Sequence, residues 1–82
     1  MNDRRIKSDQ HISIGANIKR IRMEQKVPPM YLVKQMNLRG FTSMTKQHFY
    51  KLENDIANIT ASKLVVLVDL LNVDIHEFFR PL

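Results

Sequence analysis

Hydrophobic residues along this chain recur at intervals of three and four, and no stretch alternates apolar and polar positions over a useful length. Ile14, Ile18 and Ile21 form the first such set, directly after Ser13, which can cap a helix. The later sets are Leu32, Val33 and Met36; Phe49 and Leu52; Leu64, Leu67, Val68 and Leu71; and Ile75, Phe78 and Phe79. The pattern predicts a compact all-α fold with five helices and no sheet.

Prolines set the limits of the first two predicted helices. A residue before proline is pushed out of the α region, so Val27 ends the first helix. Pro29 then suits the first turn of the second helix, which we expect from Met30 to about Met36. The segment 37–43 holds one of only two glycines and predicts an extended loop between the second and third helices.

Capping residues mark the remaining helices. Thr45 can accept a backbone N–H bond at the start of a third helix that ends near Asn54. Asp55 follows, where a left-handed residue can close the helix. Thr60 opens a fourth helix through about residue 71, and Asp74 caps a short last one.

The size of the chain indicates one small domain. Residues 1–12 are polar and aperiodic, so we expect a flexible basic arm before a helical domain at 13–80. With no cysteine, the chain has neither disulfides nor a thiolate metal site, which fits a reducing cytoplasm. No apolar run approaches the roughly 20 residues of a membrane span. We therefore expect a cytoplasmic protein with no membrane partner.

The positive charge is concentrated in the first two thirds of the chain. The formal net charge is +5, with 11 Lys and Arg against 5 Asp and Glu up to Asp55, and 2 against 3 after it. A basic region of this kind suits a polyanionic partner, although solvated basic faces without one are common.

The helix expected at 45–54 carries the most informative polar face. With Phe49 and Leu52 on its apolar stripe, long donor side chains remain on the other side, namely Lys46, Gln47, Tyr50 and Lys51. Such donors can reach phosphates and base edges together in a DNA major groove. Double-stranded DNA is therefore the leading candidate partner, and a solvated helix face is the simpler alternative.

The order and spacing of these segments resemble the helix-turn-helix domain of lambdoid phage repressors, Cro proteins and their bacterial relatives, the XRE family. No single piece is specific, but together they cover most of the chain: residues 14–22, Leu32 and Val33, residues 45–54, and residues 60–79 with their closing stretch 72–79. The resemblance implies a repressor-like DNA-binding domain and a transcriptional regulator, more often a repressor, from a bacterium, a phage or a mobile element.

The resemblance also implies roles for individual residues. It assigns base contacts to Lys46, Gln47 and Lys51, which suits Lys for guanine and Gln for adenine. It implies a structural ion pair between Arg22 and Glu53. It makes His48 and Tyr50 flank contacts to phosphate or a thymine methyl. The complete set of expected backbone or flank contacts is Arg39, Thr45, His48, Tyr50, Asn54 and Asn58.

Several positions depart from the family pattern. Pro28 and Pro29 stand where relatives carry Ser or Thr and then a phosphate-binding Gln, and the following loop is longer than the usual turn. Arg39 on that loop is the candidate replacement for the lost phosphate contact. Asp55 replaces the usual Gly, and residues 56–58 lack the Lys or Arg that often binds a phosphate. These departures weaken the expected phosphate contacts more than the base-reading set.

Two other interpretations stay open. The proline pair, the long loop and the few phosphate donors favour a protein-interaction module that keeps the repressor fold. The chain also resembles the DNA-binding head of a larger peptide-sensing regulator, for which the domain's function is the same. For a DNA-binding protein we expect a homodimer through the C-terminal helices, with Ile75, Phe79 and Leu82 at the interface, on an inverted-repeat operator.

Catalysis has little basis in this sequence. The chain has no Cys nucleophile, no Gly-rich phosphate loop and no interpretable Ser, His and Asp spacing. Asp74, His76 and Glu77 are close in sequence, but helix capping explains them better than metal binding, because ligands at i and i+2 point to different sides of a helix. We expect no enzyme activity, no cofactor and no metal.

Overall fold

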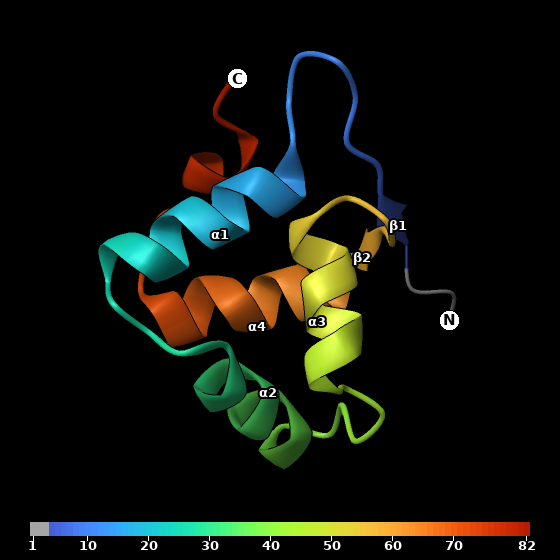
Figure 1. Cartoon of the computed structure of the whole chain (residues 1–82), viewed down its shortest axis with the longest axis vertical. Helices are drawn as coiled ribbons and strands as arrows, with labels where there is room; N and C mark the ends of the chain where they lie inside the picture. Colours follow the sequence, from blue (N-terminus) through green and yellow to red (C-terminus); the bar gives the residue numbers. More distant parts are fainter. Residues whose placement is uncertain (1–3) are drawn as a thin grey trace.

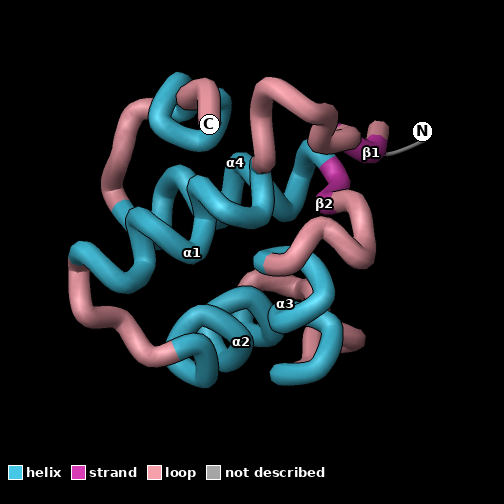
Figure 2. The backbone as a smooth tube through the Cα atoms, turned by 45° about the horizontal axis from the view of Figure 1, so that its top comes forward, coloured by secondary structure: helices cyan, strands magenta, loops and turns pink. Residues whose placement is uncertain are grey.

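The computed structural model describes residues 4–82, which form a mostly helical domain with one small sheet (Figure 1). The elements of this part of the chain are β1 (Arg5–Ile6), α1 (Ile14–Glu24), α2 (Pro29–Leu38), α3 (Lys46–Glu53), β2 (Ile59–Thr60), α4 (Ala61–Leu71) and a 3-10 helix, η1 (Ile75–Phe79). Helix α3 packs against both α1 and α2, while α2 also packs against α4 (Figure 2). The sequence therefore predicted a mostly helical domain correctly.

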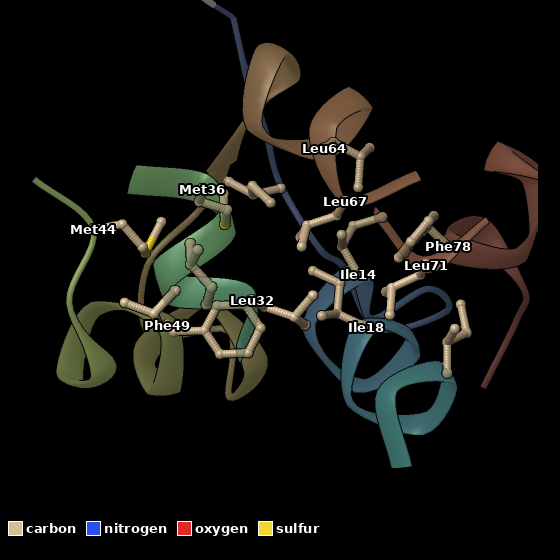
Figure 3. Close-up of a cluster of buried hydrophobic side chains, with 14 residues drawn as sticks. Ile14, Ile18, Leu32, Met36, Met44, Phe49, Leu64, Leu67, Leu71 and Phe78 are labelled. Atoms are coloured by element: carbon tan, nitrogen blue, oxygen red, sulfur yellow. The ribbon is translucent and has the colours of Figure 1, made fainter. Parts of the chain in front are cut away.

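One hydrophobic core joins the four α-helices and η1. Figure 3 shows side chains from all of these elements in a single cluster, with Met44 near one end and Phe78 near the other. Its members with no exposed surface at all are Ile18, Leu32, Met36, Leu67 and Phe78. Most of the apolar stripes expected from the three-and-four spacing are faces that the helices bury, but Ile75 of the last set is 40% exposed.

Ser13, Thr45 and Asp74 perform their predicted capping roles. Ser13 Oγ accepts a hydrogen bond from the Ala16 N–H (3.0 Å), and Thr45 Oγ1 accepts one from the His48 N–H (3.1 Å). Asp74 caps η1 in the same way, through the His76 N–H at 2.8 Å. These bonds satisfy N–H groups that have no partner inside the helix, which is why the elements begin where they do.

The prediction of no sheet is wrong. β1 pairs antiparallel with β2, with Arg5 opposite Thr60 and Ile6 opposite Ile59. The Arg4 carbonyl then accepts a hydrogen bond from the Ala61 N–H, so the start of α4 is satisfied by backbone instead of by the Thr60 side chain. Residues 5 and 6 belong to the segment expected as a flexible arm; residues 1–3 of that segment lie outside the described residues.

Of the five predicted helices, the described residues form four as α-helices, and the short last one is of the 3-10 type. The second helix is longer than expected, and its connection to α3 spans residues 39–45. The Asn37 amide at the end of α2 donates to the carbonyls of Val33 (2.8 Å) and Met44 (3.0 Å). That side chain thereby links α2 to the segment before α3.

Candidate nucleic-acid interface

Helix α3 presents a polar face because its apolar face is buried. Phe49 and Leu52 have relative exposures of 1% and 3% and point into the core. Lys46, Gln47, Tyr50 and Lys51 are consequently exposed on the other side. The outward set is the one that the sequence predicted.

These side chains surround one open pocket of about 530 Å³. Four of its lining residues are Lys46, Gln47, Tyr50 and Lys51, and the fifth is Ile56, from the turn after α3. No carboxylate lines this pocket. The three expected base contacts thus lie together on one surface, where Lys46, Gln47 and Lys51 supply hydrogen-bond donors beside it.

The turn after α3 brings Ile56 to this surface. Asp55 has a φ of 57°, the left-handed conformation expected for it from the sequence. The Ile56 N–H then donates to the Lys51 carbonyl at 2.9 Å. The chain therefore folds back along α3, and a residue that the sequence analysis did not single out joins the polar face.

The Asp55 carboxylate holds that turn against the start of α1. Its oxygens accept hydrogen bonds from the hydroxyls of Ser8 (2.7 Å) and Ser13, and from the Gly15 N–H (3.0 Å). A negative charge at a helix N-terminus is favourable because the unpaired N–H groups there carry partial positive charge. Asp55 thus has a structural role that offsets the loss of the glycine expected at this position.

Helix α3 is also fixed to α1 by the ion pair expected between Arg22 and Glu53. Arg22 Nε lies 2.7 Å from Glu53 Oε2, and Arg22 Nη2 lies 3.2 Å from Oε1. The two side chains are only 12% and 6% exposed. A two-pronged, nearly buried pair of this kind sets the position of α3, so that its outer face is presented in one orientation.

Four of the expected flank contacts are placed as follows. Thr45 is occupied in capping α3, and the Asn54 amide donates to the Tyr50 carbonyl at the other end of the helix (2.9 Å). Asn58 is exposed. Arg39 differs from its expected role, because its Nη1 forms an ion pair with Asp69 Oδ2 on α4 at 2.5 Å. The candidate replacement for a phosphate contact is therefore partly neutralised.

His48, a further expected flank residue, lies among positive charges from three other positions. Partial burial lowers the pKa of its imidazole, and the nearby charges of Lys63, Lys51 and Arg5 lower it further. Arg5 lies on β1, and Lys63 on the first turn of α4 has its Nζ 6.0 Å from the centre of the Phe41 ring. The small sheet thus brings Arg5, which the sequence analysis assigned to a flexible arm, to the side of α3.

A titration of His48 followed by NMR checks this arrangement. We expect its midpoint below 6.5, and we expect Lys63→Gln to raise it, because that change removes a positive charge that disfavours the imidazolium. Lys26→Gln, at the end of α1, is the matched control and should leave the midpoint unchanged. Because folding lowers the pKa of His48, the unfolded state binds a proton at a higher pH than the folded state does. The free energy of unfolding should therefore decrease as the pH falls from 6.5 through the folded-state pKa. A midpoint insensitive to Lys63→Gln contradicts the placement.

A second, smaller hollow of about 180 Å³ lies where α1, the start of α2 and α3 meet. Lys19, Lys46 and Asn54 are among its lining residues, as is Pro29 at the start of α2. Lys19 was not expected at this surface from the sequence. Lys19 is exposed, so it adds a cation beside the start of α2, where Pro29 stands.

Some of the Lys and Arg side chains in residues 4–82 form ion pairs and others do not. Within residues 4–82, carboxylates pair with the arginines Arg20, Arg22, Arg39 and Arg80. In the same part of the chain, no ion pair involves the cations on and beside α3, which are Arg5, Lys19, Lys46, Lys51 and Lys63. The face around α3 is therefore a surface of uncompensated positive charge, which favours anionic ligands.

Comparisons of the chain with protein-family models, with curated proteins and with solved structures give no match. The described residues include no helix that combines the length and the apolar character needed to cross a membrane. Over the same residues, no group of three or more His, Asp or Glu side chains is arranged to hold a metal ion. The candidate site of the described residues is the α3 surface.

Proposed function

We propose that this protein is a sequence-specific DNA-binding regulator of transcription, and that α3 reads the major groove. The observation that carries the proposal is the pocket that Lys46, Gln47, Tyr50 and Lys51 of α3 line together with Ile56, without a carboxylate, on a helix fixed by buried contacts. Helix-turn-helix domains of the repressor type use a helix in this way. The same proposal includes a repressor-like fold, and it assigns the protein to repression of transcription instead of activation.

The electrostatics support this function. Cations flank α3 on both sides, with Lys19 toward α2 and Lys63 toward the small sheet. Contacts to phosphates fix the register of a protein on DNA, whereas contacts to base edges supply sequence preference. Lys19, Lys63 and Arg5 fit the first role, and the pocket residues of α3 fit the second.

Selection of bound duplexes from a random DNA pool at moderate salt tests the function. We expect enrichment of an inverted repeat whose half-sites lie about 34 Å apart, because two-fold dimers place recognition helices in successive major grooves. The affinity for the selected duplex should fall steeply as the salt concentration rises, since phosphate contacts release counterions. The proposed dimer surface includes the exposed Ile75 and Leu82 and the half-buried Phe79. Failure to enrich any sequence contradicts the function, and a selected single half-site contradicts the dimer.

Substitutions separate base-reading from backbone contacts. Lys46→Ala or Gln47→Ala should reduce the preference at particular base pairs by about 1 to 3 kcal/mol each, because each removes contacts to base edges. Lys63→Gln should weaken binding to all sequences about equally and reduce the salt slope by about one. Competition titrations against single-base variants of the selected duplex measure both effects. Identical behaviour of all three variants contradicts the assignment of α3 as the reading helix.

One observation favours a different function, that of a protein-interaction module. The outer face of α2 exposes Met30 (41%), Tyr31 (49%) and Leu38 (80%). An exposed apolar group on a helix next to the proposed reading helix suits a protein partner. Salt discriminates between the two functions, because an apolar interface depends only weakly on ionic strength.

A further inference from the structure

Two large apolar side chains are exposed inside the polar face of α3. Tyr50 is 61% exposed and Ile56 is 64% exposed, and both line the pocket that contains Lys46, Gln47 and Lys51. Neither residue belongs to the hydrophobic core or to the partly buried side chains packed against it. Their apolar surface is therefore available to a ligand.

The position of Ile56 is set by its backbone, which makes it a fixed wall of the pocket. Asp55 before it is held in the left-handed conformation, and its carboxylate accepts hydrogen bonds from Ser8, Ser13 and the Gly15 N–H. The N–H groups of Ile56 and Ala57 both donate to the Lys51 carbonyl, at 2.9 and 3.2 Å. Ile56 is thus held beside α3 by contacts at both ends of the turn, and it does not need a ligand to order it.

The chemistry of the pocket specifies its ligand. Two lysines and a glutamine line the pocket and suit an anionic ligand rich in acceptors, while Tyr50 and Ile56 suit an apolar group on that ligand. In the major groove, the apolar group on a base edge is the 5-methyl of a pyrimidine. Gln47 in the same pocket suits adenine, which pairs with thymine in DNA. The methyl group is therefore that of a thymine in these A·T pairs and not that of 5-methylcytosine.

We propose that Tyr50 and Ile56 form a subsite for the 5-methyl group of one thymine in each half-site, and that Ile56 is a specificity-determining residue. The subsite rests on the proposed DNA-binding function and adds a residue outside α3 to the reading surface. Removing the methyl group should weaken binding about fourfold, which corresponds to burial of one methyl-sized group at about 0.8 kcal/mol.

The test replaces thymines in the selected duplex by uracil, one position at a time. Uracil lacks only the methyl group, so base pairing and phosphates are unchanged. For the unmodified protein we expect about a fourfold loss of affinity at one position per half-site. Ile56→Ala should bind the thymine duplex about fourfold more weakly and should no longer distinguish uracil from thymine at that position. A duplex with 5-methylcytosine there in place of thymine tests whether the methyl alone suffices; binding as tight as with thymine would overturn the assignment to thymine.

Val65→Ala is the matched control, because Val65 is an equally exposed (59%) apolar residue on α4 outside the pocket. It should retain the affinity and the uracil sensitivity of the unmodified protein, and melting curves verify that both variants fold. If the protein binds the selected duplex but ignores every uracil, or if Ile56→Ala keeps full uracil sensitivity, the subsite is overturned and the proposed function stands. If no duplex is selected at all, both are overturned.

Discussion

Replacing Glu53 with alanine is expected to lower the free energy of unfolding by about 3 to 5 kcal/mol. Both members of the Arg22–Glu53 pair are nearly buried, and their closest atoms, Nε and Oε2, lie 2.7 Å apart. Without Glu53, the guanidinium stays between α1 and α3 with the Val27 carbonyl as its remaining acceptor, at 3.1 Å. The cost arises mainly from this uncompensated buried charge. Urea denaturation followed by circular dichroism measures it.

Two variants show whether the cost has that origin. Glu24→Ala breaks an exposed pair with Arg20 within α1 and should cost no more than about 0.5 kcal/mol. The double change Arg22→Met with Glu53→Leu removes both charges and should recover most of the stability lost in Glu53→Ala, because apolar residues of similar size can replace a buried pair. A loss for Glu53→Ala no larger than that for Glu24→Ala would contradict the role of the pair.

Replacing Gly15 with alanine is expected to destabilise the domain by about 3 kcal/mol, although alanine is the better helix former by about 1 kcal/mol. A Cβ atom at position 15 would lie 2.3 Å from the Leu52 carbonyl oxygen and 2.7 Å from the Glu53 carbonyl oxygen. It would also lie 2.7 Å from Asp55 Oδ1. Since two of these atoms belong to the backbone of α3, the end of that helix must move away from α1.

Thermal melting of Gly15→Ala alongside Met23→Ala measures the effect. Met23 lies on the same helix and is 59% exposed, so its truncation should change stability by less than about 0.5 kcal/mol. Because displacement of α3 also moves the proposed reading surface, we expect Gly15→Ala to reduce DNA affinity as well. A melting temperature equal to or above that of the unmodified protein would contradict the close approach of α1 to α3.

Local signals explain the parts of the fold that were predictable. Apolar spacing and capping by Ser13, Thr45 and Asp74 act within a few residues, so they placed the starts of α1, α3 and η1. The sheet was missed because each of its strands has only two residues, too few to show an alternating pattern. Its formation depends on pairing Arg5 with Thr60, far apart in sequence.

The candidate site also has features that the sequence predicted and features that it did not. The outward face of α3 follows from helical periodicity, and the Arg22–Glu53 pair was expected from the family resemblance. The partners of other charged residues could not be derived, because they depend on which elements meet in space. Arg39 was expected to face a phosphate, yet it pairs with Asp69. Lys19 came to the surface beside α3 without any local signal.

The sequence by itself determined where the main helices lie and which side of α3 is polar, because helix periodicity and capping are short-range properties. Only the tertiary structure decided which cations remain uncompensated around α3 and which residue completes its pocket. Ile56 reaches that pocket because Asp55, in a left-handed turn, binds Ser8, Ser13 and the start of α1. Such contacts join segments that are about 40 residues or more apart, so their energies have no signature in any one stretch of the chain.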